Sequence, residues 1–245
     1  MERLRALAAH VAPAPAAEPS SFSWEGLERD SIEGLSKAFL VVRGIHGWIG
    51  CGYISADTAS RLGDAAAIYT GVSTHDDMLA AEAVAVSEAG EALGLSACPR
   101  PSDPRRSTLC TRPTTPPRAR AEVGMTGAEA LELIRGEARY GIVPQAPNPP
   151  PATPSFDWSG LTCEHIPLRW PLLVVHGSKG MLACGYINSP TGTNRTGDAA
   201  ACMTLCITHA DFLDATVKEG SVSEQGVELG LKDGMSGREA LELIR

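Results

Sequence analysis

The chain lacks the sequence signatures of many common enzyme classes. It contains no phosphate-binding Gly-x-x-x-x-Gly-Lys-Ser/Thr loop, no Gly-x-Gly-x-x-Gly fingerprint, no Gly-x-Ser-x-Gly elbow and no His-Glu-x-x-His helix. It also lacks any run of eighteen apolar residues, so we expect no membrane-spanning helix. Its seven cysteines include no Cys-x-x-Cys pair. An odd number without such spacing does not fit the disulfide framework of small secreted domains, and we therefore expect a cytoplasmic protein.

Composition indicates a globular protein with room for two modest domains. The chain has 245 residues, and 43% of them are hydrophobic. Its formal net charge of −8 favours solubility and disfavours nucleic acid and anionic membranes as partners.

The main feature of the sequence is an internal repeat. Residues 46–54, which contain Cys-Gly-Tyr-Ile, return as residues 179–187, and both copies follow an apolar stretch and precede Gly-Asp-Ala-Ala-Ala. The matching positions include Phe22 and Phe156, Cys51 and Cys184, Asp64 and Asp198, and His75 and His209. A match of this length predicts a tandem duplication.

The repeat divides the chain into segments. Residues 22–135 form the first module, which carries a Pro- and Arg-rich insert at 96–123, and residues 156–245 form the second module. Residues 1–21 are rich in Ala and Pro, and we expect a disordered arm there, with a transit peptide as the alternative. Residues 136–155 are rich in Pro and predict an extended linker. The insert is expected to be a surface loop, with a basic docking segment as the alternative.

Local patterns predict strands and short helices in an irregular order. Residues 39–42 form a buried strand, and residues 48–54 form a central strand that is apolar on both faces. Thr74, Thr126 and Ser236 each stand three residues before an acidic residue, which predicts N-terminal caps of helices. The fold class expected is α+β, with two tandem copies of a small mixed sheet-and-helix domain.

Four motifs carry a family resemblance, in the same order in which the family has them. They are residues 47–53 (Gly-Trp-Ile-Gly-Cys-Gly-Tyr), 62–67 (Leu-Gly-Asp-Ala-Ala-Ala), 71–79 and 124–131. With these motifs the chain resembles the YunC-like family, also known as domain of unknown function 1805. The resemblance covers both modules but not the arm, the insert or the linker.

The resemblance implies an α+β fold whose N-terminal β region is used for tetramerisation, and it implies no established reaction. The second module departs from the pattern. Leu205-Cys206 replace Gly71-Val72, Ala210 replaces Asp76, and residues 189–192 replace the turn at 55–58. If the family has an active site in this region, the second copy is expected to have lost it.

Two sets of repeated residues are candidates for catalysis. In the first module Cys51 would be the nucleophile, His75 its base and Asp64 the residue that orients the base. In the second module the same roles fall to Cys184, His209 and Asp198. The alternative is structural, because a cysteine between glycines in a covered strand is typically an inert small hydrophobe.

A metal site was considered for Cys202, Cys206 and His209, which have Cys-x-x-x-Cys-x-x-His spacing. Zinc would need a fourth ligand, and the first module has Ile68 and Val72 in place of the two cysteines. Thiols packed in a core explain the pair equally well. We therefore expect no metal and no cofactor.

Two functions remain open from the sequence. The favoured hypothesis is a binding or assembly module of unknown ligand that self-associates through its β region. Its two modules would pair as an intramolecular pseudo-dimer, and two chains would associate into a dimer. The alternative is a Cys-dependent enzyme, hydrolase- or transferase-like, that uses Cys51 with His75. Whether the protein is an enzyme is left open.

Overall fold

The computed structural model describes residues 22–51, 53–97, 124–135, 156–184, 186–187 and 197–245. The predictions for the arm, nearly all of the insert and the linker fall outside these residues. The strands of the first module are β1 (Glu28–Ile32), β2 (Phe39–Arg43), β3 (Trp48–Cys51), β4 (Ala66–Tyr69) and β5 (Ala85–Val86). Its helices are α1 (Ala56–Leu62), α2 (His75–Ala80), α3 (Glu88–Leu93) and α4 (Gly127–Ile134). The second module contains β6 (Thr162–Ile166), β7 (Leu172–His176), β8 (Met181–Cys184), β9 (Ala200–Cys202), the 3-10 helix η1 (His209–Leu213), α6 (Glu224–Leu229) and α7 (Gly237–Ile244).

The described residues form two mixed sheets. The first has the order β1-β2-β3-β4-β5, and the second has the order β6-β7-β8-β9. In both sheets the first three strands pair antiparallel, and the next pair is parallel: β3 with β4, and β8 with β9. The predicted α+β class, with two sheet-containing regions, is confirmed. The duplication and the domain boundaries stay predictions.

Capping explains where several helices begin. The Thr74 hydroxyl accepts a hydrogen bond from the Asp77 N–H, and the Asp77 carboxylate accepts one from the Thr74 N–H, so α2 starts at His75. This start is three residues earlier than the helix expected from Met78 onward. The predicted capping boxes that begin with Thr126 and Ser236 are confirmed at α4 and α7.

The central strands are buried on both faces, as the sequence predicts. Every residue of β2, β3 and β4 is buried. Side chains alternate between the two faces of a strand, and the alternation divides the strands of the second module between two cores. Leu173 and Val175 of β7 pack with α7, whereas Leu172 and Val174 belong to a core cluster shared with the first module.

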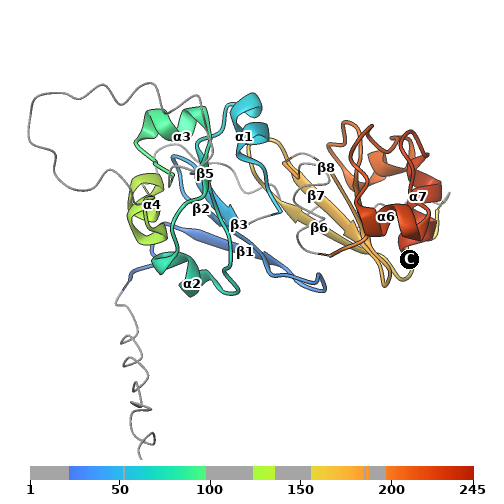
Figure 1. The fold of residues 1–245 in the computed structure, drawn as a ribbon, viewed down its shortest axis with the longest axis horizontal. Coiled ribbons are helices and arrows are strands. Elements are labelled where there is room, and N and C mark those ends of the chain that lie inside the picture. Colours follow the sequence, from blue (N-terminus) through green and yellow to red (C-terminus); the bar gives the residue numbers. More distant parts are fainter. Residues whose placement is uncertain (1–21, 52, 98–123, 136–155, 185, 188–196) are drawn as a thin grey trace, which may run out of the picture.

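The two sheets lie next to each other in the middle of the molecule (Figure 1). Helices α2, α3 and α4 stand at one end, and α6 and α7 stand at the other. Within the described part of the chain, no helix has both the length and the apolar character needed to cross a bilayer.

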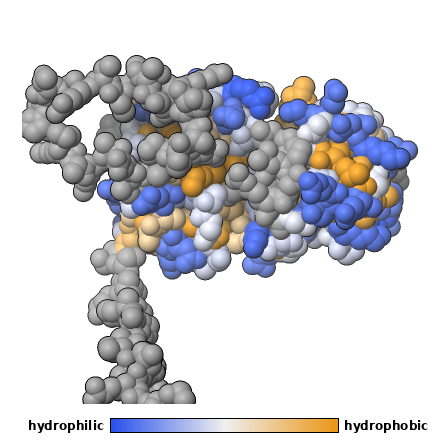
Figure 2. Space-filling view, viewed as in Figure 1, coloured by the Kyte–Doolittle hydropathy of each residue, from blue (hydrophilic) through white to orange (hydrophobic). Residues whose placement is uncertain are grey.

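A mixed surface covers the face of the molecule seen in Figure 2. Hydrophilic residues predominate on the second module there, with a hydrophobic patch among them. Large apolar side chains are also exposed in the second module, above all Leu205 at 96% and Ile207 at 59%. Leu205 is one of the residues at which the second module departs from the first.

A buried serine ties each sheet to a short helix and to the loop that follows the Gly-Asp motif. The Ser87 hydroxyl accepts from the N–H groups of Ala66 and Gly90 and donates to the carbonyl oxygen of Asp64 at 2.6 Å. Ser223 makes the same three bonds in the second module, and its donation goes to the carbonyl oxygen of Asp198 at 2.8 Å. Both serines are completely buried. They therefore fix the position of the two aspartates.

Substitution Ser87→Ala should lower the free energy of unfolding by about 2–4 kcal/mol, because it leaves buried backbone groups without partners. Urea denaturation followed by circular dichroism measures this change. The matched control is Ser73→Ala, since Ser73 is exposed, and its effect should stay within about 0.5 kcal/mol. Equal stability of the two variants would contradict the role given to Ser87.

Candidate functional site

The candidate site lies where the two modules meet. One core cluster contains residues of both, and its second-module members include Ile166, Leu168, Leu172, Val174, Met181, Ala183, Tyr186 and Ile187. These side chains come from β6, β7, β8 and the residues next to them. The faces of the two sheets that are not covered by their own helices are thus buried against each other.

A tyrosine of the first module reaches an aspartate of the second. The Tyr53 hydroxyl donates to Asp198 Oδ2 at 2.7 Å. The other carboxylate oxygen of Asp198 accepts from Ser36, from its N–H at 3.1 Å and from its hydroxyl at 2.6 Å. Tyr53 is 2% exposed, whereas Asp198 is half-buried. Three donors of the first module therefore hold one carboxylate of the second.

The reciprocal contact is more deeply buried. The Tyr186 hydroxyl donates to Asp64 Oδ2, which also accepts from the indole N–H of Trp48 at 3.1 Å. Asp64 is 7% exposed and Tyr186 is fully buried. Burial raises the pKa of Tyr186, and the hydrogen bond to Asp64 raises it further, so the phenol keeps its proton. The tyrosine is therefore the donor and the carboxylate is the acceptor.

These contacts have the reciprocity of an isologous interface, in which residue i of one partner contacts j of the other and j contacts i. Tyr53 and Tyr186 occupy matching positions in the two modules, and so do Asp64 and Asp198. The matching residues Ile54 and Ile187 pair with each other in an antiparallel bridge. The arrangement is that of a symmetric dimer in which both halves belong to one chain.

An arginine adds an ionic contact at the same boundary. Arg43 pairs with Glu28 at 2.6 Å and with Asp30 at 2.7 Å, and it donates to the Pro167 carbonyl of the second module at 3.3 Å. Only 7% of Arg43 is exposed. Its charge is thus compensated within the first module, and its remaining donor reaches across.

The structure places Cys51, His75 and Asp64 in separate hydrogen-bond environments. The Cys51 thiol donates to the Ala38 carbonyl at 2.9 Å and accepts from the Leu40 N–H at 3.1 Å. The Nε2–H of His75 donates to the Asp30 carbonyl at 3.1 Å. Asp64 bonds to neither of them. Burial raises the pKa of the Cys51 thiol, which is the opposite of what a reactive cysteine needs.

The second set is separated in the same way. The Cys184 thiol donates to the Cys206 carbonyl at 3.3 Å, and the Nε2–H of His209 donates to the Glu164 carbonyl at 2.9 Å. His209 is buried, and burial lowers its pKa and favours the neutral ring. Asp198 bonds to Tyr53 and Ser36, as described above. The catalytic role predicted for these six residues stays a prediction, because none of their hydrogen bonds joins a cysteine to a histidine.

The residues considered for zinc also have different partners. The Cys202 thiol donates to the Ile187 carbonyl at 3.2 Å, and the Cys206 thiol donates to the Thr204 carbonyl at 3.0 Å. Among the described residues, no three His, Cys, Asp or Glu side chains gather as a cation site.

Comparison with known proteins places the chain in a family. Residues 50–97 match the model of a family described as a domain of unknown function, DUF1805. A protein of unknown function from Thermoplasma acidophilum, known from a crystal structure, matches with 30% sequence identity over 29% of this chain and 81% of that one. The chain belongs to the DUF1805 family. The TM-score of that match is 0.25, too low for an argument about structure, and no curated protein matches.

The DUF1805 match contains most of the site residues of the first module. It begins within β3 and ends after α3, so it includes Cys51, Tyr53, Asp64 and His75. The tyrosine of the Cys-Gly-Tyr motif and the aspartate of the Gly-Asp motif are therefore both part of the family region.

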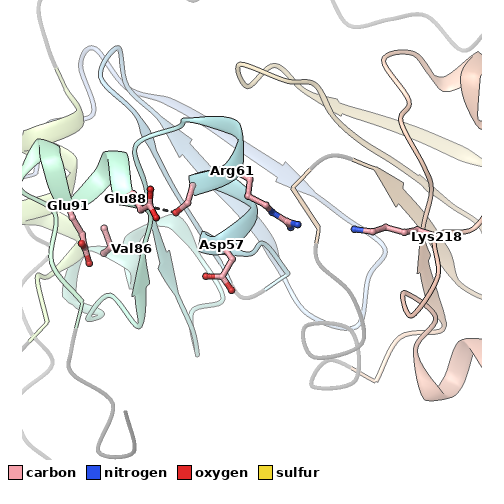
Figure 3. Close-up of a pocket in the computed structure, with 7 residues that line it drawn as sticks. Asp57, Arg61, Val86, Glu88, Glu91 and Lys218 are labelled. Atoms are coloured by element: carbon pink, nitrogen blue, oxygen red, sulfur yellow. Dashed lines mark hydrogen bonds between the residues drawn. The ribbon is translucent and has the colours of Figure 1, made fainter. Parts of the chain in front are cut away.

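Two cavities lie at the boundary between the modules. The larger, of about 680 Å³, is lined by Asp57, Ser60, Arg61, Val86, Glu88, Glu91 and Lys218. Arg61 extends from α1 and Lys218 from the second module, and they point into it from opposite sides (Figure 3). The smaller cavity, of about 240 Å³, contains Ser36 and Asp198 in its lining.

Sequence reasoning missed the tyrosines of the DUF1805 motif as partners of the aspartates. Tyr53 and Tyr186 were expected only as strand residues, and Asp64 and Asp198 were assigned to histidines. A signal was present, because both the tyrosine and the aspartate recur at matching positions in the repeat. Recurrence alone does not say, however, that each tyrosine bonds to the aspartate of the other copy.

Substitution Tyr186→Phe should lower the free energy of unfolding by about 1.5–3 kcal/mol, because the buried Asp64 carboxylate loses a donor. Urea denaturation at neutral pH measures the loss. The control is Tyr69→Phe, since the Tyr69 hydroxyl is buried without a hydrogen-bond partner, and its removal should be neutral or stabilising. A Tyr186→Phe variant as stable as Tyr69→Phe would show that the contact with Asp64 contributes nothing.

Proposed function

We propose that this protein is an assembly module, in which the two modules of one chain pair as a pseudo-dimer through their β regions. The observation that carries the proposal is the reciprocal pair of tyrosine–aspartate bonds, Tyr53 with Asp198 and Tyr186 with Asp64. Each module supplies a donor that the other requires. In this reading each module takes the place of a second subunit, and its activity is binding rather than catalysis.

Burial of apolar strand faces supports the proposal. Leu172, Val174 and Met181 are each no more than 1% exposed, and they pack in the cluster shared with the first module rather than with their own helices. Burying one such side chain stabilises by about 1.5–3 kcal/mol. Separation of the modules would expose these faces to water.

The length of the connecting segment is compatible with pairing. Residues 136–155 reach up to about 60 Å if they are extended. A tether of this kind raises the effective concentration of one module near the other to about the millimolar range. Association of two chains into a dimer with four modules stays a prediction.

The contacts of Cys51 and His75 do not favour the enzymatic alternative. A Cys-dependent reaction would require the Cys51 thiol to leave two backbone partners and to approach the His75 ring, which itself bonds to Asp30. The alternative is therefore kept as a hypothesis that thiol chemistry can test.

The pairing is tested by cutting the connection between the modules. A protease site is inserted within residues 136–155, and the cleaved protein is passed over a size-exclusion column. We expect the two fragments to elute together. The double variant Tyr53→Phe/Tyr186→Phe should raise the dissociation constant of the fragments at least about 100-fold, because each lost bond to a carboxylate costs about 1.4 kcal/mol or more.

Two results would contradict the pairing. One is separate elution of folded fragments from the cleaved wild-type protein at micromolar concentration. The other is equal affinity in the double variant and in a Tyr69→Phe control. Circular dichroism of each fragment confirms that both remain folded during the measurement.

Thiol alkylation tests the enzymatic alternative. Because burial raises the pKa of Cys51, less thiolate is present at neutral pH than for an ordinary cysteine, and we expect alkylation to increase only toward alkaline pH. At about pH 8, near the ordinary thiol pKa, folded Cys51 should react with iodoacetamide at least about tenfold more slowly than in denaturant. Peptide mapping by mass spectrometry follows the single residue. Rapid alkylation of folded Cys51 below pH 7 would instead support a catalytic thiolate.

A further inference from the structure

The smaller cavity at the module boundary has a counterpart that is filled by side chains. The cavity of about 240 Å³ is lined by Ser36 of the first module and by Ser178, Lys179, Met181, Gly197 and Asp198 of the second. At the matching place in the first module, Trp48 stands where the second has Met181, counted from the start of β3 and β8. Counted back from β2 and β7, Arg169 matches Ser36. Two large side chains are thus replaced by smaller ones around Asp198.

The side chains at the filled place indicate what chemistry the open cavity lacks. The Arg169 guanidinium donates to the Gly63 carbonyl at 3.2 Å, directly before Asp64 in the sequence. The Trp48 indole N–H donates to Asp64 Oδ2. Around Asp198, Met181 has no N–H to donate and Ser36 carries no charge. The corner of the second module therefore lacks a cation and a planar N–H donor.

Asp198 retains capacity to accept a further hydrogen bond. A carboxylate has about four acceptor positions, and the donors to Asp198 given by the structure are the Ser36 N–H, the Ser36 hydroxyl and the Tyr53 hydroxyl. A guanidinium matches this need, because its N–H groups form charge-assisted bonds with carboxylates and also reach carbonyl oxygens.

We propose that this cavity binds a small guanidinium compound, with the guanidinium at Asp198 and the Gly197 carbonyl, where Arg169 sits in the first module. Lys179 adds a positive charge to the same lining, which suits a ligand that carries a carboxylate at its other end. Free arginine has both groups. The volume lies below the roughly 300 Å³ at which pockets for drug-sized ligands begin, so a ligand of one amino acid fits.

The proposal rests on the pairing of the modules, because Ser36 and Asp198 belong to different ones. Its failure is distinguishable from failure of the pairing, since co-elution of the cleaved fragments is measured without any ligand. Fragments that stay together while arginine does not bind would reject the cavity proposal alone.

Isothermal titration calorimetry of the full chain with L-arginine tests the site. We expect one site per chain and at least about tenfold weaker binding of L-citrulline, which is neutral where arginine is charged and so forfeits a charge-assisted bond. Two variants restore the side chains of the filled place, Ser36→Arg and Met181→Trp, and each should weaken arginine binding at least about tenfold. Both are expected to fold, which thermal unfolding checks, because the first module accommodates the same side chains.

Two control variants locate the site. Lys218→Ala changes the larger cavity and should leave the affinity for arginine unchanged. Arg195→Gln removes a cation of this chain that is close to Asp198 in the sequence and lies outside the described residues, and it should also leave the affinity unchanged. The proposal is overturned if the wild type does not bind arginine, if citrulline binds equally well, if both filling variants bind as the wild type does, if Lys218→Ala abolishes binding, or if binding is detected only in Arg195→Gln.

Discussion

A buried carboxylate that each module cannot satisfy alone is the constraint on which this structure depends. A carboxylate taken out of water is costly unless hydrogen-bond donors surround it. Asp64 is 7% exposed and has one side-chain donor from its own module, Trp48, and one from the other module, Tyr186. Asp198 takes all of its observed side-chain donors from the other module. The two halves of the DUF1805 chain are therefore linked by polar as well as apolar burial.

The two copies have diverged at this boundary in a physically coherent way. The first module has a closed corner, in which Trp48 and the Arg169 of its partner fill the space around Asp64. The second has Met181 and Ser36 at the matching places, and a cavity beside Asp198 remains. In a symmetric dimer both corners would be identical. With both halves on one chain, one corner is free to change while the other keeps the contact.

Local sequence patterns predicted the elements of the fold well, because they depend on neighbouring residues. The buried strand after residue 38 and the caps at Thr74, Thr126 and Ser236 follow from apolar runs and from side chains that bond to the backbone three residues away. Element ends were predicted less well. The strand expected at 65–72 extends only from Ala66 to Tyr69, since pairing with the neighbouring strands decides where a strand stops.

The sequence by itself determined the repeat, the family, the α+β class and most elements, but only the tertiary structure decided the partners of the polar residues. Tyr53 and Asp198 are 145 positions apart, and Tyr186 and Asp64 are 122 apart. The sequence placed each aspartate beside the histidine of its own copy, whereas the structure turns His75 and His209 toward backbone carbonyls. The physical reason is that residue type and spacing fix a side chain's local face, while its hydrogen-bond partner depends on which surfaces are buried against each other.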